Sequence, residues 1–209
     1  MKLYYSPGAC SLAPHIVLEE IGADYALECV PVAEGKTQSE AYLAVNAKGR
    51  VPTLACDIGV LTEAPAILFY LGLSHPQAGL LPQDPGLLAR AAEWLNWLSG
   101  DLHATGFGAL WRPHRFTPDA DAQAAVSAAA TVNIRAAYAR IETFFAQARW
   151  AVGDTYSCVD SYLLVFYRWG NRIGLDMRAE YPAWTRHAEA VAHRPATIRA
   201  LAREGISIW

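Results

Sequence analysis

The sequence predicts an α+β protein in which a small β-α-β domain precedes an all-helical domain. Between residues 1 and 78, short β-prone runs flank an amphipathic helix, whereas from 87 to 209 the apolar residues recur at helical spacing. The segment His75–Gly86 between them carries three prolines and two glycines, which is typical of a linker. We therefore predict domains at 1–78 and 87–209.

Composition excludes several classes of protein. The chain has 209 residues, 53% of them hydrophobic, and no run of apolar residues long enough for a membrane span, so we expect a globular protein away from the membrane. Met1-Lys2 leads directly into a strand without an apolar leader, which predicts a cytoplasmic protein. A net charge of -3 gives no general attraction to nucleic acid.

The cysteine pattern argues against a zinc site and against a two-cysteine redox motif. Cys10, Cys29, Cys56 and Cys158 form no C-x-x-C pair and have no metal-ligand spacing with the six histidines. We expect reduced thiols and no bound metal.

The first segment reads as strand, turn and helix. Lys2–Tyr5 is β-prone, Ser6–Gly8 is a turn, and Pro14 suits the first turns of a helix. Cys10 then lies near a helix N-terminus, where the dipole favours a thiolate of lowered pKa, and the Ser11 hydroxyl is available to cap the helix or to donate to the sulfur. A buried cysteine acting as a small hydrophobe is the alternative.

A second strand and a short helix follow. Gly22 is suited to end the first helix, and Tyr25–Pro31 has strand character, which completes β-α-β. Ala33–Gln38 is polar and loop-like, and Glu40–Val45 is expected to form a short helix.

The next strand, Val51–Cys56, contains a proline. Because Pro52 has no N–H to donate, it belongs at a strand start or edge, and a cis bond would turn the Val51 backbone outward to pair with an extended ligand. The sequence leaves the isomer open. Asp57–Gly59 is expected to be a hairpin turn into Val60-Leu61.

Thr62 to Pro65 is expected to begin a helix that continues through Leu71, with the proline near its first position. This start is a second potential anion site, and Glu63 lies beside it to receive an ammonium group. Considered alone, Glu63 is better explained as a first-turn carboxylate that stabilises its own helix dipole.

The C-terminal domain is expected to contain two long helices, Leu87–Trp111 and Asp119–Ala148. In the second, apolar residues recur at helical spacing: Ala122, Ala125, Val126, Ala129, Val132, Ala136, Ile141 and Phe144. These small residues suit close packing and leave an apolar face for a second subunit.

Ser157 and Asp160 have the S-x-x-D spacing of a capping box that opens a helix over Cys158–Trp169. Shorter helices are expected after Pro182 and Pro195.

Five motifs in fixed order carry a resemblance over the whole chain: SPGACSLAPH, AVNAKGRVPTL, LTEAPAILFYL, WLNWLSGDLH and GDTYSCVDSYLL. Together they resemble the cytosolic glutathione transferases of the bacterial Beta class. The resemblance implies a thioredoxin-like N-terminal domain, an all-helical C-terminal domain, a homodimer, and glutathione bound in the cleft between the domains.

The resemblance also implies roles for residues of the N-terminal domain. Cys10 matches the cysteine beside the glutathione sulfur, Val51 the residue whose backbone pairs with the peptide, and Pro52 the cis-proline. Glu63 and Ala64 match the pair that holds the γ-glutamyl end.

In the helical domain, Asn96 and His103 match polar residues that approach the thiol, and Trp169 matches an aromatic residue on the co-substrate side of the cleft. Ser11 and His103 would help to hold the glutathione thiolate. Three positions depart from the family pattern: Ala64 lacks a hydroxyl for the γ-glutamyl carboxylate, Ala104 replaces a lysine common in relatives, and Ser161 replaces the apolar residue that would pack on Tyr156 at the helix entry.

Other residues have simpler explanations. Trp94, Trp97 and Trp111 are expected to be core or interface aromatics. Arg112, His114 and Arg115 are expected to form a solvated basic cluster.

The predicted function is a glutathione transferase of detoxification that conjugates glutathione to small hydrophobic electrophiles, with thiol–disulfide exchange through Cys10. Glutathione is a co-substrate, and no further cofactor is implied. Two alternatives stay open. A monothiol, glutaredoxin-like oxidoreductase would use Cys10 without a second cysteine. A non-catalytic protein with the transferase fold would instead bind a partner.

Overall fold

The computed structural model describes residues 1–209. A four-stranded sheet forms the base of the N-terminal domain, with strand order β2-β1-β3-β4. Its strands are β1 (Lys2–Tyr5), β2 (Ala26–Cys29), β3 (Thr53–Cys56) and β4 (Gly59–Thr62). β1 pairs parallel with β2 and antiparallel with β3, and β4 pairs antiparallel with β3. The predicted β-α-β unit is present.

The centre of the sheet is its most apolar part. Leu3 of β1 faces Leu54 of β3 in the register, and neither side chain is exposed. The outer strands β2 and β4 have largely exposed side chains, in keeping with their position at the edges.

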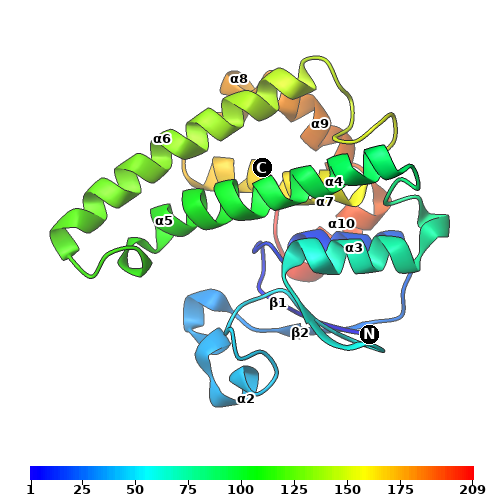
Figure 1. Cartoon of the computed structure of the whole chain (residues 1–209), viewed down its shortest axis with the longest axis horizontal. Coiled ribbons are helices and arrows are strands. Elements are labelled where there is room, and N and C mark those ends of the chain that lie inside the picture. The colour runs from blue at the N-terminus through cyan, green and yellow to red at the C-terminus, as the bar shows by residue number, and fades with distance from the viewer.

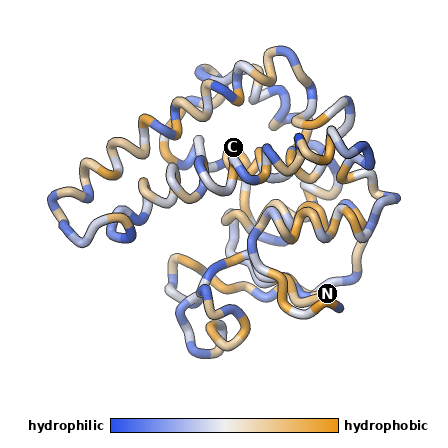
Figure 2. Tube along the Cα trace, in the orientation of Figure 1, coloured by the Kyte–Doolittle hydropathy of each residue, from blue (hydrophilic) through white to orange (hydrophobic).

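Three α-helices and three single 3₁₀ turns complete this domain: α1 (Leu12–Glu20), η1 (Val32–Glu34), η2 (Lys36–Gln38), α2 (Glu40–Leu43), α3 (Ala64–Ser74) and η3 (Pro76–Ala78). α1 and α3 lie between the sheet and the helical domain, whereas α2 lies below the sheet in the view of Figure 1. α3 is hydrophobic along most of its length, because it packs against the core (Figure 2).

The helical domain contains α4 (Pro85–Trp97), η4 (Leu98–Phe107), α5 (Gly108–Trp111), η5 (Pro113–Arg115), α6 (Ala120–Phe145), α7 (Cys158–Arg172), α8 (Met177–Glu180), α9 (Pro182–Ala192) and α10 (Pro195–Glu204). Sequence spacing missed only the short α8 among the helices labelled α in this domain. The first predicted long helix is continuous, but its middle, η4, is π-helical, and the Gly108 N–H bonds to the carbonyl of His103. Such π-helical turns are frequent at functional sites.

Helix α6 buries only part of the apolar set that recurs at helical spacing in its sequence. The buried side chains are Ala130, Ile134, Ala137, Tyr138, Ile141 and Phe145. Ala125, Ala129 and Ala136 are exposed, and Val132 is 68% exposed. α6 therefore leaves a small-residue stripe uncovered within one chain.

Both domains share one hydrophobic cluster of 47 buried residues, so they form a joint core. α7 is its most buried helix, and α1 packs on both α7 and α10. A buried hydrogen bond adds to this contact: His15 Nδ1 of α1 lies 2.8 Å from Glu204 Oε1 of α10. The two domains are thus fixed relative to each other, which fixes the shape of the space between them.

No helix of the chain combines the length and the apolar character that crossing a membrane requires.

Candidate active site

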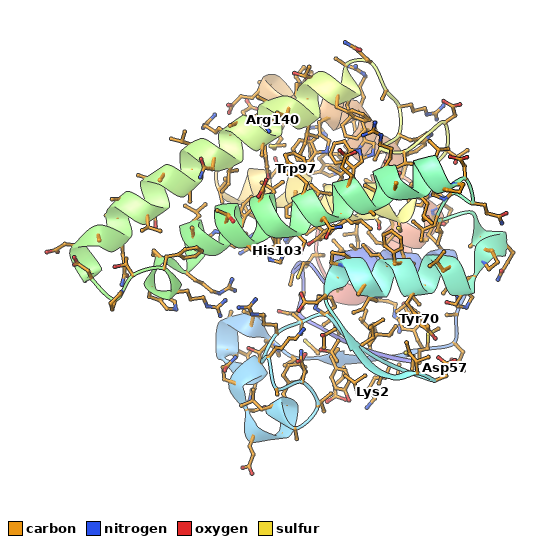
Figure 3. The ribbon with its side chains drawn as sticks, viewed as in Figure 1. Lys2, Asp57, Tyr70, Trp97, His103 and Arg140 are labelled. Atoms are coloured by element: carbon orange, nitrogen blue, oxygen red, sulfur yellow. The ribbon has the colours of Figure 1, made fainter.

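A cleft of about 700 Å³ lies between the two domains. The N-terminal domain contributes Cys10, Val51 and Glu63 to its lining, and the helical domain contributes His103 and Trp169. In Figure 3, His103 lies on the side of its helix that faces the N-terminal domain. Residues predicted separately from the two halves of the sequence therefore meet at one cavity.

Cys10 lies at the end of the turn after β1 and is only 6% exposed. Its thiol donates a hydrogen bond to the carbonyl of Val51, with Sγ and O 3.3 Å apart. Burial raises the pKa of Cys10 to about 12. The predicted lowered pKa is therefore wrong, because removing the thiolate from water outweighs the helix dipole.

The N–H groups at the start of α1 act on the sulfur but do not outweigh its burial. Burial raises the pKa of the thiol by more than the hydrogen bonds from the Cys10 and Ser11 backbone lower it. The next two N–H groups, those of Leu12 and Ala13, bond to the carbonyls of Ala9 (3.0 Å) and Cys10 (3.3 Å). Cys10 is therefore a neutral hydrogen-bond donor at neutral pH.

Ser11 has a different place from the one predicted. Its side chain is fully buried, accepts from the Ser6 N–H and donates to the Ser6 carbonyl, both at 3.2 Å. It makes no cap for α1 and does not line the cleft. The hydroxyl is used to hold the turn that carries Cys10, because burial demands a partner for it.

The Val51–Pro52 bond is cis. The preceding carbonyl, that of Arg50, accepts from the Tyr42 hydroxyl at 2.7 Å and from Asn46 Nδ2 at 2.8 Å. These bonds hold the Val51–Pro52 segment at the wall of the cleft.

The start of α3 is strained and open. Glu63 is the N-cap residue, and it is the one residue other than glycine with positive φ (72°). Its carboxylate makes no cap but pairs with Lys48 Nζ at 2.7 Å. The expectation that Glu63 stabilises its own helix from the first turn is therefore wrong. Ala64, buried at the first position of α3, lines the cleft.

Asn96 lies apart from Cys10 and His103. It is exposed, its Nδ2 donates to the Ala92 carbonyl at 2.8 Å, and it lines a small neighbouring pocket. That pocket shares Glu63 and Ser99 with the main cleft, so Asn96 lies beside the α3 start and not beside the thiol.

His103 belongs to the π-helical segment η4. Its Nδ1 lies 3.4 Å from the Tyr162 hydroxyl, and its ring meets Trp169 edge to face at 5.0 Å between centroids. Burial, aided by the charges of Arg112 and Arg50, lowers the pKa of His103 to about 4. The imidazole is therefore neutral at physiological pH.

Trp169 joins the helical domain to the turn before Cys10. Its indole Nε1 donates to the Gly8 carbonyl at 2.9 Å, while the Gly8 N–H donates to Glu204 Oε2 at 2.8 Å. Gly8 has φ of 67°, and a Cβ there would meet the guanidinium of Arg168. The turn that presents Cys10 thus requires glycine and is held from α7 and α10.

The cleft is also lined by residues that sequence reasoning did not assign to it, among them Trp111, Arg112, Arg115 and Tyr162. Tyr162 precedes Trp169 by two helical turns, so helical periodicity carried a signal for it. The sequence carried no such signal for Arg112 and Arg115, because their position depends on how the chain turns after α5. No group of three or more histidine, cysteine or acidic side chains has a geometry that could hold a metal ion.

Comparison with known proteins agrees with this architecture. The family model for the glutathione S-transferase N-terminal domain matches residues 1–72, and that for the C-terminal domain matches residues 103–195. "Glutathione S-transferase GstA" of Escherichia coli O157:H7 is 35% identical over 210 residues, which is 99% of this chain and 100% of the relative.

Solved structures are also similar. A sphingomonad glutathione S-transferase complexed with glutathione superposes with a TM-score of 0.86 at 38% identity, covering 99% of this chain and 100% of that one. A bacterial beta class enzyme from Sphingomonas chungbukensis gives a TM-score of 0.84 at 35% identity with the same coverage. This chain therefore belongs to the glutathione S-transferase family of enzymes, for which glutathione is the co-substrate.

Proposed function

We propose that this protein conjugates glutathione to small hydrophobic electrophiles in the cleft between its domains. One observation carries the proposal: Cys10 from one domain, and His103 and Trp169 from the other, line the same cavity. The N-terminal domain provides polar groups for binding a peptide, and the helical domain provides aromatic side chains. A reaction between a peptide thiol and an apolar electrophile requires both kinds of surface.

Glutathione would lie along the N-terminal domain. Glu63 would receive its ammonium group, and the open start of α3 at Ala64 would receive the adjacent carboxylate. The Val51 backbone would pair with the cysteinyl residue, which brings the glutathione sulfur next to Cys10. Because residue 64 is alanine, this carboxylate gains no side-chain hydroxyl there.

In this proposal the neutral Cys10 thiol stabilises the glutathione thiolate. The Sγ–H that donates to Val51 would turn to donate to the incoming sulfur, so the protein offers a hydrogen bond and not a second negative charge. A neutral His103 that accepts from Tyr162 at Nδ1 keeps its hydrogen on Nε2 as another donor. The glutathione sulfur then attacks the electrophilic carbon, and the leaving group departs with its electron pair.

Thiol–disulfide exchange is a second candidate reaction of the same site, favoured by the position of Cys10 in the lining of the cleft. It requires the Cys10 thiolate, which a pKa of about 12 makes scarce at neutral pH. Conjugation is therefore the main activity proposed, and exchange is the slower one.

We place this activity in cytoplasmic detoxification and in a homodimer. The exposed stripe of Ala125, Ala129, Val132 and Ala136 on α6 supports a second copy, because such a stripe allows close helix packing.

The test is retention of the purified chain on immobilised glutathione, elution with free glutathione, and assay of the eluate with an aryl chloride. We expect retention, release of chloride, and a dimer mass by light scattering. Retention without conjugation or exchange would favour a partner-binding role, and failure to bind glutathione would contradict the proposal. A monomer mass at micromolar concentration would contradict the dimer.

A further inference from the structure

The cleft contains more positive charge than its own carboxylates balance. Four arginines line it, Arg50, Arg112, Arg115 and Arg172, and none forms an ion pair. Six arginines elsewhere in the chain do: Arg90, Arg135, Arg178, Arg194, Arg199 and Arg203. Because the chain as a whole carries -3, this excess is local to the cleft.

The one carboxylate in the lining does not offset this excess. Glu63 is paired with Lys48, which also lines the cleft, at 2.7 Å, so this pair adds no net charge and leaves the four guanidinium groups uncompensated. Partial burial, together with the like charges of Arg112 and Arg50, lowers the pKa of Arg115. An anion entering the cleft would relieve this repulsion.

Two of these arginines stand beside aromatic side chains of the helical domain. Arg112 directly follows Trp111 at the end of α5, and Arg115 lies in η5, a hydrophilic turn in Figure 2. Trp111 is 39% exposed, and its ring meets that of Trp169 edge to face with the centroids 5.0 Å apart. Two aromatic rings set at an angle to each other and two guanidinium groups therefore line the same cleft.

The two carboxylates of glutathione do not account for Arg112 and Arg115. Under the proposed function, the start of α3 takes one glutathione carboxylate, and Arg50, next to Val51, is available for the other. Arg112 and Arg115 come from the opposite wall, where the co-substrate would bind.

We propose that the electrophilic co-substrates of this enzyme are aromatic compounds that carry a carboxylate. The ring would lie against Trp111 and Trp169, and the carboxylate would bind Arg112 and Arg115, whose planar guanidinium groups suit it. This inference rests on the proposed function and narrows its substrate class.

The first test is equilibrium binding to the full chain, which is measured by the quenching of its tryptophan fluorescence. The probes are 4-nitrobenzoate and 4-nitrobenzamide, which differ in charge but little in shape, and saturating S-methylglutathione fills the peptide site. We expect the carboxylate to bind about tenfold more tightly than the amide, because a charge-assisted hydrogen bond changes a dissociation constant by about that factor. The preference should shrink as salt is raised, because these side chains are partly exposed.

The variant is Arg112→Gln with Arg115→Gln, and it should bind the two probes alike. If it does not fold, Arg115→Gln alone, on an exposed side chain, should reduce the preference. Arg140→Gln is the matched control, because Arg140 is an exposed arginine of α6 without an ion pair, away from the cleft (Figure 3). It should keep the wild-type preference.

Turnover provides a separate measurement. With 4-chloro-3-nitrobenzoate the KM should rise about tenfold in the double variant, whereas with 4-chloro-3-nitrobenzamide it should stay unchanged. Equal binding of both nitro probes by the wild type, or a preference that survives the double variant, would overturn the inference. So would a preference that vanishes with S-methylglutathione, since the arginines would then serve glutathione itself. Absence of turnover with both aryl chlorides, with the binding preference intact, would count against the proposed function alone.

Discussion

Helices α3 and α7 begin in opposite ways. At α7, the Asp160 carboxylate accepts from the Ser157 N–H (2.7 Å), the Ser157 hydroxyl (3.0 Å) and the Ala151 N–H (2.8 Å), and it faces His187 Nε2 at 2.8 Å. At α3, the N-cap Glu63 turns its carboxylate to Lys48 and makes no cap bond. A helix start closed by its own chain stabilises the fold, whereas an open start is free to bind an anion.

The start of α1 extends this comparison. Burial of the thiol outweighs the Cys10 and Ser11 backbone N–H groups, which act to lower its pKa. Nearness to a helix N-terminus therefore predicts neither an anion site nor a lowered pKa unless the site also reaches solvent.

The largest effect is expected at the closed start. Asp160→Ala leaves two N–H groups and the His187 ring without their partner in a fully buried place, which should cost roughly 3–5 kcal/mol of unfolding free energy. The melting temperature should fall by about 10 °C or more. Glutathione affinity of the folded protein should stay unchanged, because Asp160 does not line the cleft.

Asp176→Ala is the matched control for that measurement. Asp176 caps α8 through the Ala179 N–H at 3.1 Å, but on the surface. Its loss should cost about 1 kcal/mol. Equal destabilisation by the two substitutions would mean that the buried network at Asp160 adds nothing to an ordinary cap.

The open start should show the reverse pattern. Glu63→Gln removes the proposed partner of the glutathione ammonium group, so the Kd for glutathione should rise roughly 10- to 100-fold. The melting temperature should change little, because the Lys48 pair is on the surface and contributes at most about 1 kcal/mol. Isothermal titration and thermal melts measure the two effects separately.

Glu93→Gln controls for the loss of a surface carboxylate, since Glu93 pairs only with Arg90 on the exposed face of α4. It should leave both quantities unchanged. A Glu63 variant that melts early and still binds glutathione would mean that α3 is closed in the same sense as α7.

Most elements of the fold were predictable because local patterns and packing agree. The apolar spacing of α7, the S-x-x-D start at Ser157 and the proline starts of α9 and α10 all match the structure. The buried face of α6 was not predictable from its alanines. Alanine fits equally well in a core and in a subunit interface, and the larger Ile134, Tyr138 and Ile141 determine which face turns inward.

The cleft was predictable only where residues belong to a motif. Cys10, Val51, Glu63, His103 and Trp169 all line it. Ser11 and Asn96 do not, because each finds a backbone partner nearby: Ser6 for the first and Ala92 for the second. The ionisation of Cys10 could not be read from its position in the sequence, since its burial in the folded chain determines it.

The smallest effect is expected at Cys10, where a neutral donor is replaced by another. Cys10→Ser keeps a hydroxyl that can donate to the glutathione thiolate, so kcat/KM for conjugation should change by about twofold or less, whereas Cys10→Ala loses the donor and should lower it about 3- to 10-fold. An unchanged rate in Cys10→Ala would mean that other donors alone hold the glutathione sulfur.

The rate of disulfide exchange tests the ionisation of the Cys10 thiol. The Cys10 thiolate attacks one sulfur of glutathione disulfide, a new S–S bond forms as the old one breaks, and glutathione thiolate leaves. Because the pKa of about 12 lies far above the assay range, the thiolate fraction and the rate of adduct formation should rise about tenfold for each pH unit between 7 and 9. Intact mass measures the adduct, and Cys10→Ser assigns it to this residue among the four cysteines. A rate that levels off near neutral pH would mean that the thiolate forms readily after all, and that α1 acts on its neighbour as the open start of α3 is proposed to act on glutathione.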